Sequence, residues 1–217
     1  MQQKNNKKQY NKIQQIIRIL VQIYPDVKTD LNHSTPFELL IATMLSAQCT
    51  DIRVNMVTPN LFSKYPTPDM LATAKPNDVE NIVKSTGFYK NKTKSIIETS
   101  EKIVNNFNSI VPSTMDKLIT LPGVGRKTAN CVLGTYFNPE GIVVDTHVIR
   151  ITNLLGIVKT KNAEHIEQQL ISIVPSNMWV NFSHLLIKHG RNICIARRPK
   201  CLECSINMYC DTFIKKK

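Results

Sequence analysis

The 217-residue chain is long enough for one large domain or two small ones, and 42% hydrophobic residues can fill a core. Its 28 Lys and Arg against 16 Asp and Glu give a net charge of +12, which favours a polyanionic partner such as nucleic acid or a membrane surface, although codon bias in an AT-rich genome would also enrich lysine. No apolar run approaches the roughly 20 residues that span a bilayer, and the N-terminal stretch lacks a signal peptide's apolar core, so we expect a cytoplasmic chain outside the membrane.

Helical periodicity runs through the chain and no stretch alternates convincingly as a strand, so the predicted fold class is all-α. Residues 12–24 place their apolar side chains on one helical face. The capping box Thr35-Pro36-Phe37-Glu38 predicts a helix to about Ala47. Further helices are predicted at residues 51–65, 68–74, 77–86, 92–107, 114–120, 126–137, 146–155, 163–174 and 177–189. Pro59 lies inside one of them and should kink or split it.

The stretch LPGVGRKTAN, residues 121–130, combines a glycine turn with the start of a predicted helix. Gly123 and Gly125 permit a turn whose backbone N–H groups point outward, and the positive helix end adds to the attraction for a phosphate. Such a turn would hold a nucleic-acid backbone without reading sequence. A plain turn between two helices would use similar residues.

Lys127 stands beside Arg126 at the positive end of that helix, where two cations are electrostatically unfavourable unless they have a use. The Arg126 charge and the positive helix end both favour the neutral form of the lysine. The neutral amine is a nucleophile, whereas the ammonium is not. Eighteen residues later, Asp145 precedes another predicted helix. It is either a helix N-cap or a carboxylate that moves the amine's proton and stabilises a positive sugar, and both roles are compatible. A phosphate contact is the alternative role for Lys127.

Four cysteines lie within the last 24 residues: Cys194, Cys201, Cys204 and Cys210. Their separations of six, two and five residues allow four thiolates to meet at one metal centre, and the spacing alone leaves zinc and a 4Fe-4S cluster both open. Four unrelated thiols are the alternative. Cys49 and Cys131 are predicted to be ordinary core residues within helices.

These motifs together resemble the helix-hairpin-helix DNA glycosylases of the endonuclease III type, over nearly the whole chain. LPGVGRKTAN is similar to the family's hairpin with its catalytic lysine at Lys127, and VDTHV to the segment with its catalytic aspartate at Asp145. The cysteine spacing is the family's 4Fe-4S pattern, so the resemblance favours iron-sulfur.

The resemblance implies a bifunctional base-excision-repair enzyme that flips a damaged pyrimidine out of double-stranded DNA. Lys127 would attack the sugar C1′, displace the oxidised base and form a Schiff base, and β-elimination would cut the strand 3′ to the abasic site. LSAQCTD resembles the segment whose glutamine fills the vacated position, which assigns that role to Gln48. Without the family, Gln48 would be a helical surface residue.

The resemblance also implies a monomer with two helical domains. Residues 29–139 would form a six-helix barrel domain carrying the helix-hairpin-helix, and residues 1–28 with 140–217 would surround the cluster. The expected DNA contacts are Gln48, Leu121, Gly123, Gly125, Arg126, Arg197, Arg198 and Lys200. The last three lie between the first two cysteine ligands, so the cluster is expected to position cations rather than take part in the chemistry.

Departures from the family's pattern at Phe88, Pro59 and Ile149 do not touch the proposed chemistry directly. Phe88 stands where a leucine wedge against the orphaned base is expected, and Pro59 follows the Gln48 segment. Within the superfamily, an adenine mismatch glycosylase is the alternative, but it lacks a lysine at position 127 and carries a further C-terminal domain. Outside enzymes, the alternative is a non-catalytic DNA-binding protein with a structural four-cysteine metal site.

Overall fold

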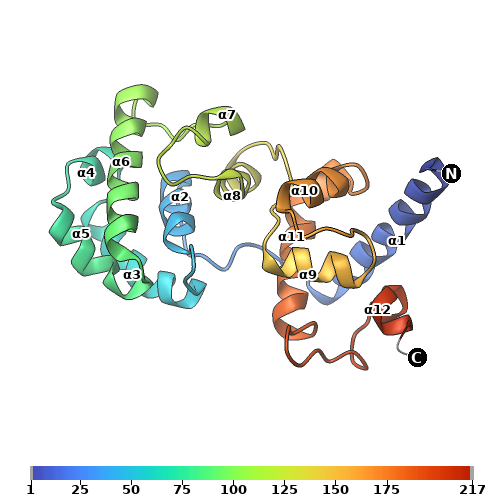
Figure 1. The fold of residues 1–217 in the computed structure, drawn as a ribbon. Coiled ribbons are helices and arrows are strands. Elements are labelled where there is room, and N and C mark those ends of the chain that lie inside the picture. Colours follow the sequence, from blue (N-terminus) through green and yellow to red (C-terminus); the bar gives the residue numbers. More distant parts are fainter. Residues whose placement is uncertain (1, 216–217) are drawn as a thin grey trace. The chain divides into compact units, whose positions relative to one another are not determined.

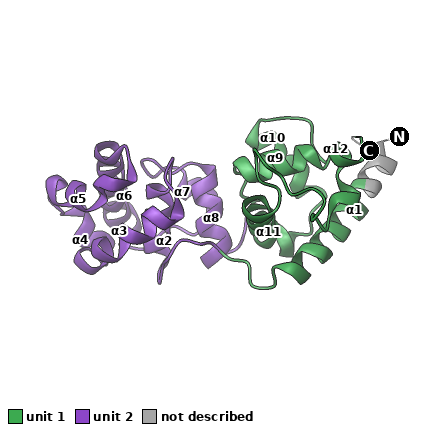
Figure 2. Ribbon diagram, turned by 90° about the horizontal axis from the view of Figure 1, so that it is seen from below, with its two compact units in different colours: residues 1–28, 141–217 green, residues 29–140 purple. Residues whose placement is uncertain are grey.

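A computed structural model describes residues 2–215, with side chains from residue 9 onward. Within that range the chain is helical and has no strand, which confirms the all-α class (Figure 1). The chain forms two compact units: unit 2 is residues 29–140, and unit 1 combines residues 1–28 with 141–217 (Figure 2). None of the helices described is both long and apolar enough to cross a membrane.

Unit 2 is built around a buried central helix, α2. Its elements are α2 (Pro36–Leu45), α3 (Asp51–Lys64), α4 (Pro68–Ala72), α5 (Pro76–Val83), the short 3₁₀ segment η1 (Lys84–Thr86), α6 (Tyr89–Phe107), α7 (Met115–Leu118) and α8 (Arg126–Tyr136). Helix α2 contacts α3, α6 and α8 and is buried over nearly its whole length. Helix α6 packs against α4 and α5. The hairpin that precedes α8 is thereby supported by the core of the unit.

Unit 1 joins the first helix of the chain to its last helices. Its elements are α1 (Gln2–Ile23), α9 (Thr146–Leu154), α10 (Ala163–Ile171), η2 (Ser176–Met178), α11 (Trp179–Asn192), η3 (Asn207–Tyr209) and α12 (Asp211–Ile214). Helix α11 contacts both α1 and α9, and its fully buried residues Phe182, Leu185 and Leu186 share one core with Ile13 and Leu20. The hydrophobic burial of α1 therefore depends on the C-terminal half of the chain.

Local capping explains where several helices begin. The hydroxyl of Thr35 accepts from the Glu38 N–H at 3.1 Å, and the Glu38 carboxylate accepts from the Ser34 N–H at 2.6 Å. In a capping box the carboxylate would accept from the N–H of Thr35 itself, so here the return bond goes to the preceding residue. Thr50 caps α3 and Asn162 caps α10 in the same way. Each cap satisfies a backbone donor that has no partner within the helix.

Two expectations about the α2–α3 region are corrected. Helix α3 passes through Pro59 without being split, because the helix buries Val54, Val57 and Leu61, which outweighs a cost of about 3 kcal/mol for an interior proline. Cys49 does not lie within a helix, because α2 ends at Leu45 and residues 46–50 form a turn before α3.

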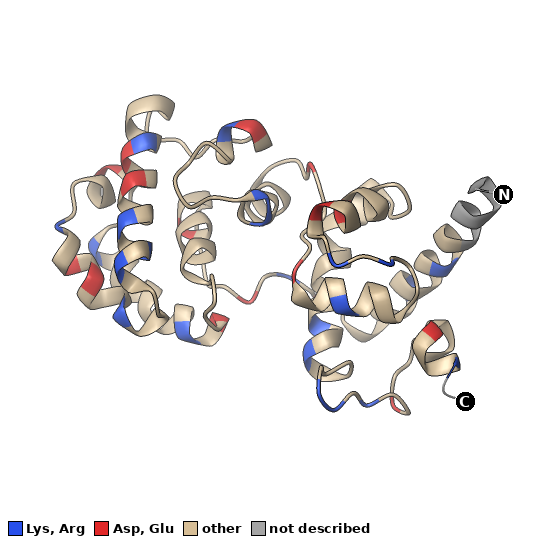
Figure 3. Cartoon of the chain, in the orientation of Figure 1, with Lys and Arg blue, Asp and Glu red and all other residues tan. Residues whose placement is uncertain are grey.

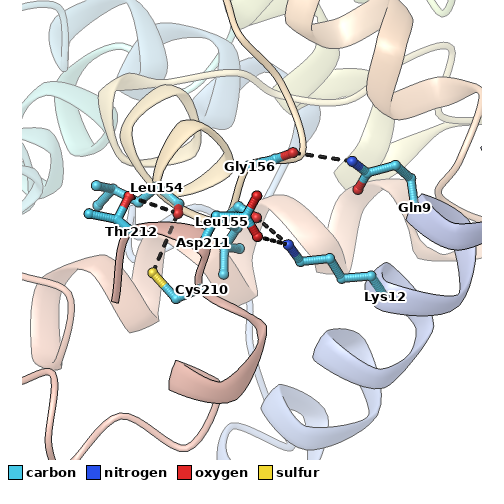
Figure 4. Close-up of polar contacts among 8 residues, drawn as sticks. All are labelled: Gln9, Lys12, Leu154, Leu155, Gly156, Cys210, Asp211 and Thr212. Carbon is cyan, nitrogen blue, oxygen red and sulfur yellow. Dashed lines mark hydrogen bonds and ion pairs between the residues drawn. The ribbon is translucent and has the colours of Figure 1, made fainter. Parts of the chain in front are cut away.

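Hydrogen bonds within unit 1 join helix α1 to the end of α9 and to α12 (Figure 4). The Lys12 ammonium donates to Asp211 Oδ1 at 2.7 Å and also to the Leu155 carbonyl, and the Gln9 amide donates to the Gly156 carbonyl at 3.1 Å. Gly156 has φ +70, and a Cβ on it would lie 1.9 Å from Asp211 Oδ2. Only glycine therefore permits this approach.

Candidate active site and cysteine loop

The turn between α7 and α8 depends on its two glycines for different reasons. Gly123 has φ +73, and a Cβ there would lie 3.0 Å from the Ser95 Cβ, so a side chain would be both strained and crowded. Gly125 has an ordinary φ of −97 as the N-cap of α8, and a Cβ on it would meet nothing within 4 Å. The absence of a side chain at Gly125 leaves open space beside the first turn of α8.

Leu121 belongs to the packing of this turn rather than to its surface. Its side chain is only 2% exposed. Its N–H donates to the Leu118 carbonyl and its carbonyl accepts from the Val124 N–H, both at 3.1 Å. These contacts use its apolar surface and its N–H and C=O groups inside unit 2, and the DNA contact expected at Leu121 stays a prediction.

Two side chains of helix α6 donate hydrogen bonds to the turn between α7 and α8. The Thr99 hydroxyl donates to the Pro122 carbonyl at 2.6 Å, and the Lys102 ammonium donates to the Thr120 carbonyl at 2.8 Å. Both carbonyls precede Gly123. The turn is thus anchored to a 19-residue helix, which limits its freedom to move.

Lys127 is exposed as the second residue of α8, next to the half-buried Arg126. Its charge acts on the Cys131 thiol one helical turn further on. Burial raises the pKa of Cys131, while a contact from the Thr43 hydroxyl and the Lys127 charge oppose that rise. Cys131 is thus a protonated packing residue in α8, as predicted, and Lys127 is the amine that α8 presents to solvent.

Asp145 is the N-cap of α9 and is half-buried. Its Oδ1 accepts from the Val148 N–H at 2.8 Å, which confirms the capping interpretation. That bond uses one of two carboxylate oxygens, so capping fixes the carboxylate without preventing chemistry at the other oxygen. Asp145 belongs to unit 1 and Lys127 to unit 2.

Gln48 and Phe88 share an unusual backbone conformation. Both lie in the left-handed region, with φ of 54 and 48, although neither is glycine. Gln48 is exposed in the turn between α2 and α3, and Phe88 is 65% exposed as the N-cap of α6. Non-glycine residues held in this region cost about 1 kcal/mol or more, and such strain is concentrated at functional sites.

The cysteine loop, residues 194–210, begins directly after α11 and ends at α12. Cys210 Sγ donates to the Leu154 carbonyl at 3.4 Å, and the Thr212 hydroxyl donates to the same carbonyl at 3.0 Å (Figure 4). At the other end, the Arg150 guanidinium donates to the Cys194 carbonyl at 2.6 Å. Helix α9 therefore fixes the first and the last cysteine of the loop.

The four cysteine thiols lie close enough to interact electrostatically. Burial, together with smaller contributions from Cys194, Cys210 and Cys201, raises the pKa of Cys204 to about 11, against an opposing hydrogen bond from the Ile206 backbone. Burial likewise raises the pKa of Cys194, with Arg150 opposing it. With a pKa of about 11 the free Cys204 thiol is protonated at neutral pH, so a metal would have to displace its proton.

The four cysteines of the loop are the residues that could hold a metal centre. Among the described side chains, no three His, Cys, Asp or Glu converge closely enough to hold one ion. A single zinc ion would draw four sulfurs to within about 4 Å of one another, whereas each thiolate of a 4Fe-4S cluster binds a different iron. Four thiols of this kind could hold either a zinc ion or a 4Fe-4S cluster.

Cations follow the same loop (Figure 3). Arg197, Arg198 and Lys200 are all exposed, and the Lys200 N–H closes the loop by donating to the Ile193 carbonyl at 2.9 Å. The three positive charges thus project from a segment tied at both ends. Charges held in this way suit contact with phosphates.

Sequence reasoning missed three residues that hold these segments. Arg150 supports Cys194, and His189 Nε2 lies 3.5 Å from Cys204 Sγ, with burial lowering the pKa of His189 to about 4. Lys92 is buried in α6. For Lys92 a signal existed, because it shares a helical face with Ile96 and Ile103. For the other two, the partners lie 44 and 15 residues away and no local pattern marks them.

The comparisons with known proteins agree with this arrangement. Residues 41–176 match the HhH-GPD superfamily of base excision DNA repair proteins. Endonuclease III of Synechocystis is 46% identical, covering 91% of both chains, and endonuclease III of Escherichia coli is 43% identical, covering 86% of this chain and 89% of its own. A non-covalent endonuclease III–DNA complex superposes with a TM-score of 0.90 at 38% identity, covering 95% of this chain and 97% of that one.

The fold and the hairpin thus define a helix-hairpin-helix protein of the base-excision-repair superfamily. Similarity at this level over nearly the entire length goes further than the superfamily. The chain belongs to the endonuclease III family.

Proposed function

We propose that this protein removes oxidised pyrimidines from duplex DNA and then cuts the strand 3′ to the abasic site. As an endonuclease III family member it is a bifunctional DNA glycosylase and AP lyase acting on duplex DNA with damaged bases. The observation that carries this proposal is the exposed side chain of Lys127 beside a glycine turn with open space at Gly125. A non-catalytic DNA-binding protein is not favoured, because a 38% identical relative is described as a trapped covalent intermediate with DNA.

Lys127 is the proposed nucleophile. Its neutral amine attacks C1′ of the flipped nucleotide, and the glycosidic bond breaks with its electron pair leaving on the base. Loss of the amine proton and opening of the sugar ring give a Schiff base. Removal of a C2′ proton then breaks the C3′–O bond, and hydrolysis of the imine releases the lysine.

Asp145 is proposed to accept the amine proton and to stabilise positive charge on the sugar. The N-cap hydrogen bond supports this role, because it holds the carboxylate in one orientation. Gly123, Gly125 and Arg126 are proposed to hold one phosphate, and Arg197, Arg198 and Lys200 others, without reading sequence.

Asp145→Asn is expected to lower base excision by about a hundredfold or more while leaving the thermal stability nearly unchanged, because asparagine also caps helices well. Asp145→Ala should add a loss of about 1 kcal/mol in unfolding free energy. Single-turnover excision and thermal melting separate the two effects. If the Asn variant kept full excision and only the Ala variant were impaired, Asp145 would be a cap alone.

Gln48 is proposed to fill the position vacated by the flipped base. Gln48→Gly is expected to relieve backbone strain and stabilise unit 2 by up to about 1 kcal/mol, yet to reduce excision from duplex DNA. Asn108→Gly is the matched control, since Asn108 is exposed with φ 51 at the end of α6. Equal excision by both variants would remove Gln48 from the proposed role.

The four cysteines of the loop are proposed to hold a 4Fe-4S cluster, which the family is known to bind. The cluster would fix the loop and its cations rather than take part in bond breaking. Because its substrate is genomic DNA, we place the protein in the cytoplasm with the nucleoid.

Borohydride trapping tests the proposed function. The purified protein is incubated with a duplex containing one thymine glycol, and separately with an abasic duplex, in the presence of borohydride. A covalent adduct on both is expected from a Schiff-base enzyme. No adduct on either duplex, with DNA binding intact, would contradict the proposal.

A further inference from the structure

Two exposed turns of unit 2 share a strained conformation and a common support. One is residues 46–49, closed by the Cys49 N–H donating to the Ser46 carbonyl at 3.0 Å, with Gln48 at its tip. The other is the Gly87–Phe88 turn, in which both residues have positive φ. Strained conformations persist only where surrounding contacts hold them.

That support is Lys92, which is only 8% exposed. Its ammonium donates to the carbonyl of Leu45, the last residue of α2, and to that of Thr86, the last residue of η1, both at 2.8 Å. Its backbone N–H donates to the Phe88 carbonyl at 3.0 Å. One residue therefore binds the chain just before the Gln48 turn and on both sides of Gly87.

The side chain also lies near the far side of the Gln48 turn, because the Cys49 thiol acts electrostatically on it. Its hydrogen-bond partners are carbonyls rather than a carboxylate, so the burial of its charge is only partly offset. Burial accordingly lowers the pKa of Lys92. An apolar side chain would fill this site at lower cost if only packing mattered.

We propose that Lys92 is a positioning residue that joins the Gln48 turn and the Phe88 turn into one rigid unit that enters the DNA duplex. This inference rests on the proposed function. Phe88 offers an exposed aromatic ring of the kind that separates base steps, and Gln48 offers an exposed polar side chain. Lys92 acts through these two residues and does not touch the reacting atoms.

The test compares a substrate that needs the Gln48 and Phe88 turns to open the duplex with one that does not. A duplex containing thymine glycol must be opened before excision, whereas a single-stranded abasic oligonucleotide has no pair to separate. Lys92→Met is expected to lower kcat/KM on the duplex by about tenfold to a hundredfold, as small misplacements do. Trapping on the single strand should stay within about twofold of the parent. Lys94→Met is the matched control, because Lys94 lies on the same helix with its side chain 75% exposed.

A second measurement separates positioning from general destabilisation. If Lys92 acts through Gln48, adding Gln48→Ala to Lys92→Met should cost less than the sum of the two single losses in log kcat/KM. If Lys92→Met does not fold, Lys92→Arg keeps the charge and the donors but separates the two carbonyls, and it should show the same loss on the duplex alone.

The outcomes are distinct. An unchanged duplex-to-single-strand ratio in folded Lys92→Met, or in Lys92→Arg where only that variant folds, overturns the inference while leaving the proposed function intact. A parent protein that forms no adduct with any abasic DNA overturns the proposed function, and the inference with it.

Discussion

Lys127→Ala is expected to fold and bind DNA like the parent but to lose the borohydride adduct and strand cleavage, by about three orders of magnitude or more. The side chain is exposed, so its removal leaves no cavity. Alanine also favours the helix, and the loss of a cation from a positive helix end is favourable. Any loss of activity is therefore a loss of chemistry rather than of structure. Gel-resolved trapping and circular dichroism measure the two separately.

Two controls make this result specific. Lys127→Arg keeps the positive charge but cannot act as the amine nucleophile, so it should also lose the adduct while retaining affinity for DNA. Lys75→Ala removes another exposed lysine at a helix N-terminus, the N-cap of α5, and should retain full activity. An adduct that persists in Lys127→Ala would show that another amine is the nucleophile.

Removal of one proposed cluster ligand should have the second large effect. Cys204→Ala is expected to lose its iron and the visible absorption band of the cluster, because three thiolates no longer complete the ligand set. Without the cluster, the loop is held only by hydrogen bonds such as those of Arg150 and Thr212. DNA affinity should fall, and the slope of log K against log salt should flatten by about 0.9 for each phosphate that the loop cations no longer neutralise, up to three.

Iron analysis and salt-dependent binding check this expectation. Cys49→Ala, outside the loop, should keep a full complement of iron. Zinc in place of iron in the parent would contradict the cluster proposal. Full iron content in Cys204→Ala would exclude Cys204 as a ligand.

Much of the helical organisation could be predicted, because helices begin and end on local signals. The caps at Thr35, Thr50 and Asn162 each act within three or four residues of sequence. Pro59 shows the limit of such reasoning. A proline is a local signal for interruption, but the buried residues on either side of it decide that α3 continues.

Some features of the candidate site follow from local sequence, and others depend on distant residues. Asp145 could be predicted as a cap because its partner, the Val148 N–H, is three residues away. The conformation of Gln48 could not, since the helix predicted to reach Ala47 ends at Leu45 and leaves Gln48 in a turn with positive φ. The packing of the Leu121 side chain also depends on residues that its motif does not contain.

The sequence by itself determined the helical class, the glycine turn before Lys127 and the set of four cysteines, since each depends on residue type and short spacing. Only the tertiary structure decided that Lys92 binds two turns and that Lys12 reaches Asp211. Their hydrogen bonds join residues 47 and 199 positions apart. The physical reason is that such contacts form only after hydrophobic burial has brought distant segments together, and no local pattern of charge or polarity records which carbonyl or carboxylate they will meet.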